Sequence, residues 1–183
     1  MNEIALHILD IVQNSIRAGA WKIEVLISEN KGKDIFELVI KDDGKGMDQE
    51  QLNEVMDPFF TTRTTRKVGL GIALLKQGVE QTGGHMEIES QKGKGTFLRA
   101  NYLHNHVDRP ILGDIAGTMT ILIGANPKIR FIYTHQTPLS TFEFDTKEVL
   151  EELDGVPIND ADILKALKEL IEENLDMIEA SVH

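Results

Sequence analysis

The chain of 183 residues contains no cysteine, no long hydrophobic run and no cluster of basic residues. The missing cysteine excludes disulfides, thiolate nucleophiles and cysteine-ligated zinc. No apolar stretch approaches the length needed to cross a bilayer, and the first residues lack the pattern of a secretory signal. We therefore expect a cytoplasmic protein without a membrane contact. Hydrophobic residues make up 41% of the chain, which suits a folded protein with a core.

The charge of the chain is strongly acidic and unevenly placed. The formal net charge is −11, and residues 143–183 alone hold 13 acidic residues against 3 basic ones. The preceding 142 residues are almost neutral. A nucleic-acid-binding surface would need a clustered basic face, so nucleic acid is not an expected partner.

Residues 61–71 carry the first sign of a binding site. The sequence TTRTTRK (61–67) has no apolar residue and three positive charges, and Gly69-Leu70-Gly71 then opens a helix. A glycine turn at a helix N-terminus presents free N–H groups and the positive end of the helix dipole to an anion. The segment predicts a phosphate site, although a surface loop before a helix explains it equally well on its own.

Periodicity predicts the remaining elements. In the first part we expect a helix capped by Asn2, strands, and a closing hairpin; in the second, three strands and two helices. The expected ranges of the first part are helix 2–17, strands 21–28 and 34–40, helix 49–56, a helix from Gly69, and strands 85–91 and 95–103. Those of the second part are strands 117–125, 128–135 and 140–145, a helix 146–153 capped by Thr146, and a helix after Asn159 or Asp160.

Three further polar groups fit the chemistry of a nucleotide site. Asp10 and Asn14 lie one helical turn apart, and a neutral amide oxygen is a suitable ligand for Mg²⁺, which takes few protein ligands. Asp42 begins a D-x-G-x-G sequence after a predicted strand, where a buried carboxylate can accept a hydrogen bond from an exocyclic amine. Lys92-Gly93-Lys94-Gly95-Thr96 forms a glycine turn that enters the next strand.

In this order the motifs resemble the N, G1, F, G2 and G3 boxes of the GHKL, or Bergerat-fold, superfamily of ATPases and kinases. Residues 1–103 carry the resemblance, and DPFFTT…GLGIALLKQGVEQTGG…KGKGTF is most similar to the catalytic domain of sensor histidine kinases. The resemblance implies a two-layer α/β sandwich, with helices on one face of a mixed sheet, over residues 1–105. Residues 106–183 are expected to form a small α+β module for dimerisation or partner binding, or to extend the first sheet.

The resemblance also implies roles for individual residues. Asn14 would bind Mg²⁺, and Asp42 would recognise the adenine amino group with support from the Thr96 hydroxyl. Asp10 would be the base that activates water or a hydroxyl, while Arg17 and Lys67 would act near the phosphates. The other residues implied to contact ATP are Gly44, Gly46, Met47, Phe60, Arg63, Gly69, Leu70 and Gly71.

Three departures from the family pattern leave the activity open. The base position holds Asp rather than Glu, and Lys67 replaces the first glycine of the usual G-x-G-L-G. The first predicted helix begins near residue 3, so we expect no dimerisation helices with a phosphoacceptor histidine ahead of it. We expect a Mg²⁺-dependent, ATP-binding signalling protein that transfers the γ-phosphate to a partner protein, as a histidine-kinase-like or anti-sigma-type serine kinase. An ATP-hydrolysing switch and a non-catalytic nucleotide sensor are the alternatives.

Two structural readings accompany these functional ones. If the chain phosphorylates itself, the candidate acceptors are His7, His104, His106 and His135. His7 is expected to support the site or to face solvent. The other three are expected to lie in a linker or a strand. The apolar stripe between Ile163 and Ile178 predicts either core packing or the seam of a homodimer.

Overall fold

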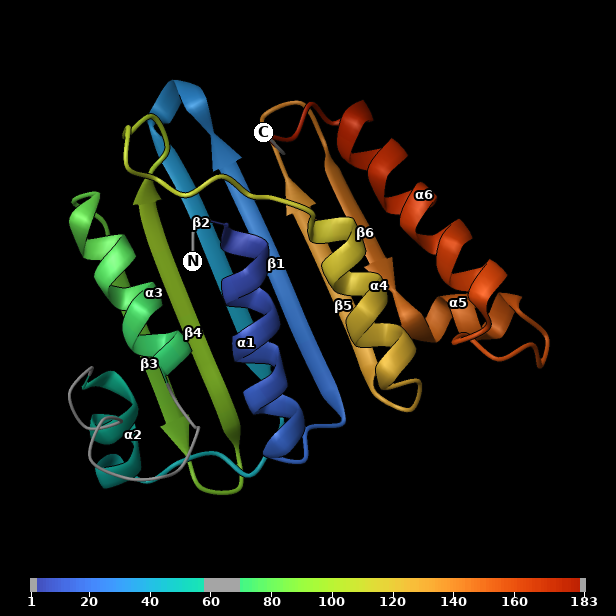
Figure 1. Cartoon of the computed structure of the whole chain (residues 1–183), viewed down its shortest axis with the longest axis horizontal. Helices are drawn as coiled ribbons and strands as arrows, with labels where there is room; N and C mark the ends of the chain where they lie inside the picture. Colours follow the sequence, from blue (N-terminus) through green and yellow to red (C-terminus); the bar gives the residue numbers. More distant parts are fainter. Residues whose placement is uncertain (1–2, 58–69, 182–183) are drawn as a thin grey trace.

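The structure is a computed structural model that describes residues 3–57 and 70–181. Its centre is one mixed six-stranded sheet with strand order β3-β4-β2-β1-β5-β6 (Figure 1). The strands are β1 (Lys22–Asn30), β2 (Ile35–Asp42), β3 (His85–Gln91), β4 (Gly95–Leu103), β5 (Arg130–Gln136) and β6 (Thr141–Asp145). The helices are α1 (Ile4–Arg17), α2 (Gln49–Met56), α3 (Leu70–Gln81), α4 (Ile115–Ala125), α5 (Thr146–Glu152) and α6 (Ala161–Met177), with a short 3₁₀ turn, η1, at Lys31–Lys33.

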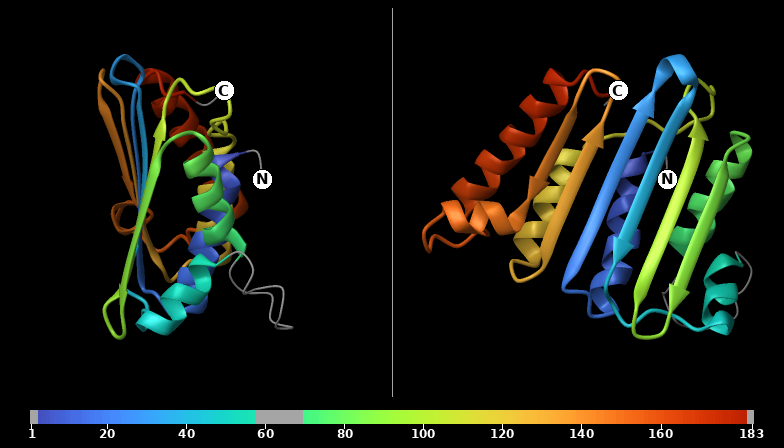
Figure 2. Two further views of the ribbon diagram at one scale, coloured as in Figure 1. Left: turned by 90° about the vertical axis from the view of Figure 1, so that its left-hand side faces the viewer. Right: turned by 180° about the vertical axis from the view of Figure 1, so that it is seen from behind.

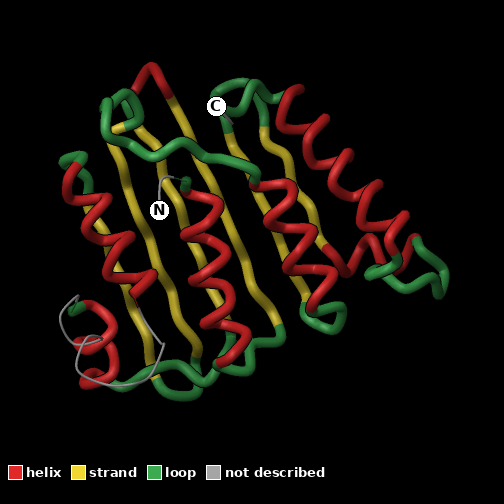
Figure 3. Tube along the Cα trace, in the orientation of Figure 1, coloured by secondary structure: helices red, strands yellow, loops and turns green. Residues whose placement is uncertain are grey.

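The sheet and the helices form two layers. Figure 2 shows the strands edge-on with the helices on one side, and Figure 3 shows these helices side by side in front of the strands. Side chains along β1 alternate between buried and half-buried, as expected for a strand with one covered face. In the residues that the structure describes, no helix covers the other face (Figure 2). The predicted two-layer α/β fold is confirmed.

Strand β1 lies at the middle of the sheet and joins its two parts. It pairs antiparallel with β2 and parallel with β5, which lies about a hundred residues further along the chain. The strands of residues 130–145 therefore continue the sheet of residues 22–103, and the two parts share one hydrophobic core. The boundary expected at residue 105 falls in the linker between β4 and α4.

The strand predicted over residues 117–125 is wrong, because this segment belongs to helix α4. Asp114 begins the helix, and its side chain accepts a hydrogen bond from the Gly117 N–H. The helix lies on the sheet and against α6, and most of its residues are buried. A helix buried on nearly all sides is apolar all round, so its sequence loses the period that would separate it from a buried strand.

Two predicted helix caps are also replaced. The N-cap position of α1 is Glu3, which makes no side-chain cap, and Asn2 lies outside the described residues. The N–H groups of the first two residues of α1 instead donate to the carbonyl oxygens of Ile111 and Leu112, each at 2.9 Å. Helix α1 is thus capped by backbone from the linker after β4, which sequence periodicity cannot reveal.

At α5 the N-cap is Asp145 rather than Thr146. The Asp145 carboxylate accepts a hydrogen bond from the Lys147 N–H, while the Thr146 hydroxyl accepts one from the Phe131 N–H of β5. The cap predicted at Asp160 for α6 is confirmed. The apolar stripe of α6 is core within the chain, because Leu167, Ile171 and Leu175 are buried.

None of the helices in residues 3–57 and 70–181 has the length and apolar character needed to cross a membrane.

Candidate functional site

Asp42 is a buried carboxylate at the end of β2, with only 7% of its surface exposed. Its Oδ2 accepts a hydrogen bond from the Ser15 hydroxyl of α1 at 2.6 Å, and its Oδ1 accepts one from the Gly44 N–H at 2.9 Å. These two donors fix the orientation of the carboxylate. A carboxylate offers about four acceptor positions, so Asp42 keeps the capacity to accept a further hydrogen bond.

Thr96 lies directly across from Asp42 in the pairing of β2 with β4. Its hydroxyl oxygen is 3.0 Å from the Ser90 Oγ of β3, which also accepts a hydrogen bond from the Met47 N–H at 2.8 Å. Ser90 thus connects the residue opposite Asp42 to the loop that follows β2. Thr96 is in the predicted neighbourhood, but its described hydrogen bond goes to Ser90 rather than to Asp42.

The glycine loop after β2 interlocks with the turn between β3 and β4. Gly46 has a φ of +63°, and a Cβ placed on it would overlap the Gln91 carbonyl oxygen. Gly95 has a φ of +88°, and a Cβ there would overlap the Asp42 carbonyl oxygen. The Gly93 N–H donates to the Lys45 carbonyl oxygen at 2.7 Å. Gly46 and Gly95 must therefore be glycine because of their positive φ and because another backbone segment approaches each of them closely, with or without a ligand.

Asn14 lies on α1 next to Ser15, and it is half-buried. Its side-chain oxygen accepts a hydrogen bond from the Arg17 guanidinium at 3.1 Å. The oxygen predicted to bind Mg²⁺ is therefore bonded to the cation predicted to act near the phosphates. Arg17 is exposed, so its side chain is free to leave Asn14 for an anion that enters the site.

Asp10 lies one turn before Asn14, and it meets the first turn of α3. A Cβ placed on Gly71 would overlap the Asp10 carboxylate, so only glycine lets α3 approach α1 this closely. The predicted base and the end of the predicted phosphate loop are therefore in contact. On α3 the apolar residues Ile72, Leu75 and Val79 are buried in the core.

Several predicted residues lie outside the described residues, and their roles stay predictions. They are Phe60, Arg63, Lys67 and Gly69. Leu70 is described only as the first residue of α3.

Three of the candidate phosphoacceptor histidines are buried. The exposed fractions are 3% for His7, 4% for His104 and 0% for His135. Burial lowers the pKa of His7 below its ordinary value. None of these rings is accessible to a phosphate donor in the folded chain. His106 is half-buried in the linker after β4.

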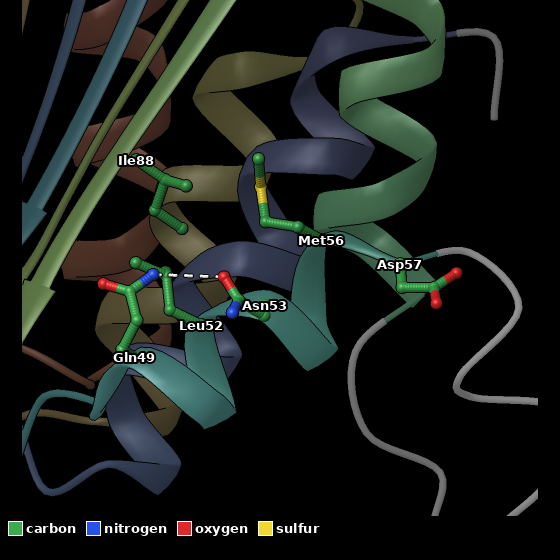
Figure 4. A pocket seen from close by; sticks show the side chains of 6 residues that line it. All are labelled: Gln49, Leu52, Asn53, Met56, Asp57 and Ile88. Carbon is green, nitrogen blue, oxygen red and sulfur yellow. Dashed lines mark hydrogen bonds between the residues drawn. The ribbon is translucent and has the colours of Figure 1, made fainter.

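A cavity of about 340 Å³ lies between α2 and β3. Leu52 and Met56 of α2 and Ile88 of β3 form its apolar wall, while the Gln49 side-chain amide donates to the Asn53 side-chain oxygen at 3.1 Å (Figure 4). Neither Asp42 nor Asn14 lines this cavity. We place the candidate site at Asp42 because its hydrogen bonds, and not a cavity volume, define a recognition chemistry.

Ser15 is the site residue that sequence analysis missed. It occupies the buried face of α1, where the helical period would place another apolar side chain beside Ile11 and Val12. A hydroxyl in an apolar stripe is the signal that could have pointed to it, since a buried hydroxyl needs a partner.

The buried Asp42 carboxylate lies at a strand end, hydrogen-bonded to the helix that carries Asp10 and Asn14. Residues 2–106 match the family of histidine kinase-, DNA gyrase B- and HSP90-like ATPases. The chain belongs to this family, and the predicted GHKL resemblance is confirmed.

The chain is also similar to individual proteins over part of their length. The sensor protein SrrB of Staphylococcus aureus is 33% identical over 101 residues, which are 52% of this chain and 17% of SrrB. The N-terminal domain of a DNA repair protein aligns with a TM-score of 0.51 at 18% identity, over 78% of this chain and 52% of that chain. The Aquifex aeolicus MutL ATPase domain, complexed with ADP, aligns with a TM-score of 0.46 at 19% identity, over 84% of this chain and 69% of that chain. This chain thus spans only part of each relative.

Proposed function

We propose that the chain binds ATP with Mg²⁺ at Asp42, Asn14 and the start of α3, and transfers the γ-phosphate to a partner protein in bacterial signalling. The observation that carries the proposal is the Asp42 carboxylate, which is buried, oriented by Ser15 and Gly44, and still able to accept a hydrogen bond. Such a group selects a base with an exocyclic amine, and it disfavours a base with a carbonyl oxygen at that place.

The burial of His7, His104 and His135 removes three candidate acceptors and supports an acceptor on a partner protein. Phosphoryl transfer needs the acceptor atom to reach the γ-phosphate in line, and His7, His104 and His135 cannot do so without local unfolding. A partner protein with an exposed histidine or serine meets this requirement. The histidine-kinase-like and the anti-sigma-type serine kinase forms of the proposal differ in this acceptor.

The place of Asp10 favours a second candidate, an ATP-hydrolysing switch. Asp10 touches Gly71 at the start of α3, where the phosphates would bind, so its carboxylate can take a proton from water as well as from a serine hydroxyl. Hydrolysis would then change the contacts of the α3 terminus. Phosphorylation of histidine needs no such base, because the imidazole nitrogen is itself the nucleophile.

The residues present fit a nucleotide-bound Mg²⁺. Asn14 offers one half-buried amide oxygen, and among the described residues no group of three or more His, Asp or Glu side chains is arranged to hold a metal ion alone. Mg²⁺ usually takes one or two protein ligands, with phosphate and water for the rest. When bound, the ion would neutralise charge on the phosphates. Arg17 would release Asn14 and move to the phosphates.

The test is calorimetric titration with ADP and Mg²⁺, followed by incubation with γ-labelled ATP. Asp42→Asn should weaken binding about 10- to 100-fold, because it places an amide where a charged acceptor is needed. Asp43→Asn is the matched control, since Asp43 is exposed and accepts hydrogen bonds from the Trp21 and Lys22 N–H groups instead. Unchanged affinity in Asp42→Asn would contradict the proposed site.

The label then separates the two activities. Transfer of label to an added partner supports the kinase, whereas free phosphate without protein label supports the switch. Asp10→Asn should abolish hydrolysis or serine phosphorylation and leave histidine phosphorylation intact. Serine phosphorylation that survives in this variant would contradict the role of Asp10.

A further inference from the structure

A second buried carboxylate lies at the other end of the sheet from Asp42. Glu29 of β1 is only 4% exposed and points toward the helix-covered face, in line with the apolar residues of that strand. Its Oε1 accepts hydrogen bonds from the Ser181 N–H at 2.7 Å and the His135 Nε2 at 2.8 Å. Its Oε2 is 3.1 Å from the His104 Nε2. Glu29 thus joins β5, the residue after β4 and the C-terminal tail.

The hydrogen bonds around Glu29 fix the proton positions on both rings. An ionised carboxylate only accepts, so each histidine carries a proton on Nε2. The Nδ1 of His135 is 2.7 Å from the Tyr133 hydroxyl oxygen. The buried Nδ1 of His104 has no hydrogen-bond partner among the described residues. The cluster is therefore a specific network in which Glu29 accepts from three segments of the chain.

The tail reaches Glu29 by turning back from α6. Beyond Met177 the Ile178 carbonyl oxygen accepts a hydrogen bond from the Thr137 hydroxyl at 2.7 Å, and Glu179 has a φ of +55°. The Ser181 N–H then reaches Glu29 near the end of β1, and the Ser181 Oγ is 3.5 Å from the His104 Nε2 in the linker after β4. Residues 178–181 form the tail strap, which is held at one end by Thr137 and at the other by Glu29.

The linker carries this contact to α1. The His104 carbonyl oxygen accepts from the Arg109 Nε at 2.7 Å, and the Arg109 Nη1 donates to the Pro110 carbonyl oxygen at 3.0 Å. Arg109 also lies over the Phe36 ring, 4.8 Å from its centre. The two residues after Pro110 supply the carbonyl oxygens that cap α1. A continuous set of hydrogen bonds thus links the tail strap to the helix that carries Asp10 and Asn14.

From these contacts we propose that the Glu29 cluster is a clasp through which the C-terminal tail strap controls the nucleotide site. With the strap closed, Glu29 and His104 hold the linker in place and the linker caps α1. When the Ser181 N–H leaves Glu29, the cluster loses one of three donors, the linker loosens and the first turn of α1 frays. Asp10 and Asn14 then lose their fixed position, and nucleotide binding weakens. The link to nucleotide rests on the proposed function, but the link to α1 does not.

Ser181→Pro tests the clasp in the full chain, because proline removes the N–H donor and keeps the chain length. Ser181→Ala is the matched control that keeps this N–H. Asp160→Ala is a second control, since it removes the cap of α6 without touching the cluster. Hydrogen exchange of the Ile4 and Ala5 amides reports the capping of α1 without nucleotide. Titration with ADP and Mg²⁺ reports the site.

We expect Ser181→Pro to speed exchange at Ile4 and Ala5 about tenfold and to weaken ADP binding about 5- to 20-fold relative to Ser181→Ala, within the usual range of coupling between sites. Exchange and affinity within twofold of Ser181→Ala would overturn the clasp, and so would the same changes in Asp160→Ala. If the wild type fails to bind ADP, the proposed function fails, and the exchange result still decides whether the strap reaches α1.

Discussion

Asp42 and Glu29 are buried carboxylates on two paired strands, and they differ in how fully they are bonded. Asp42 sits opposite Ile23 near one end of β1, and Glu29 sits opposite Phe36 near the other. Asp42 accepts two hydrogen bonds, both from donors beside the candidate site. Glu29 has three donors, from three different segments. The carboxylate with more spare acceptor capacity, Asp42, suits ligand recognition, and Glu29, which is bonded to three segments, suits a structural role.

The largest expected effect is on the free energy of unfolding, through Glu29. The hydrogen bonds to Glu29 lower its pKa from 4.5 to about 2 despite burial. A shift of this size corresponds to about 3 kcal/mol of folding free energy at pH 7. Glu29→Gln should lose about this much free energy of unfolding, because the side-chain NH₂ group of Gln would face N–H donors that now bond to the carboxylate. Urea unfolding measures the loss, and Glu24→Gln on the half-exposed face of β1 is the control. A loss below about 1 kcal/mol would refute the structural role.

The same pKa shift fixes the sign of the pH dependence. Because the folded-state pKa of Glu29 is lowered, its contribution is fully present above the ordinary value of 4.5 and is lost as the pH falls toward about 2. The stability difference between wild type and Glu29→Gln should stay constant from neutral pH down to about 5, and it should shrink in more acidic urea titrations. A difference that already shrinks near neutral pH would assign the effect to another group.

At the Asp42 end, the glycine loop offers a matched pair of substitutions. Gly46 and Gly93 both have positive φ, but a Cβ overlaps backbone only at Gly46. Gly93→Ala should cost about 1 kcal/mol of unfolding free energy from its conformation alone. Gly46→Ala should cost about 2 kcal/mol more, even without nucleotide, because the loop and the turn must separate. If thermal unfolding gives the same loss of stability for Gly46→Ala and Gly93→Ala, the loop and the turn can separate at Gly46 without cost.

Ser15 gives the smallest effect and the one most specific to recognition. Ser15→Ala leaves Asp42 buried but releases its Oδ2, so ADP affinity should fall about tenfold, the equivalent of about 1.4 kcal/mol. Ser28→Ala removes a hydroxyl from the open face of β1 and should not change affinity. Calorimetry measures both. An unchanged affinity in Ser15→Ala would mean that Gly44 alone orients the carboxylate.

The difference between the two carboxylates also explains what the sequence could predict. Asp42 is found from sequence because its glycine partner lies two residues away and its motif is local. The partners of Glu29 lie 75, 106 and 152 residues away, so no local pattern contains them. Ser15 lies between these cases, since its position on α1 is periodic but its partner is on another strand.

The secondary structure was likewise predictable where its signal is local and not where it depends on distant segments. The strands of the hairpin at β3 and β4, and helix α2, agree with prediction because their periodicity is a local signal. Helix α4 was predicted as a strand because its burial between the sheet and α6 removes the polar face that would reveal a helix. The parallel pairing of β1 with β5 leaves no trace in either strand alone.

That parallel pairing has a consequence for synthesis of the chain. β1 is complete at residue 30, but the strand that covers its free edge ends only at residue 136. Until then, a nascent chain exposes a row of unpaired N–H and C=O groups along an apolar strand, which is a template for association between chains. The order of translation therefore makes the ATPase-family part of this protein depend on its later segment for protection from aggregation.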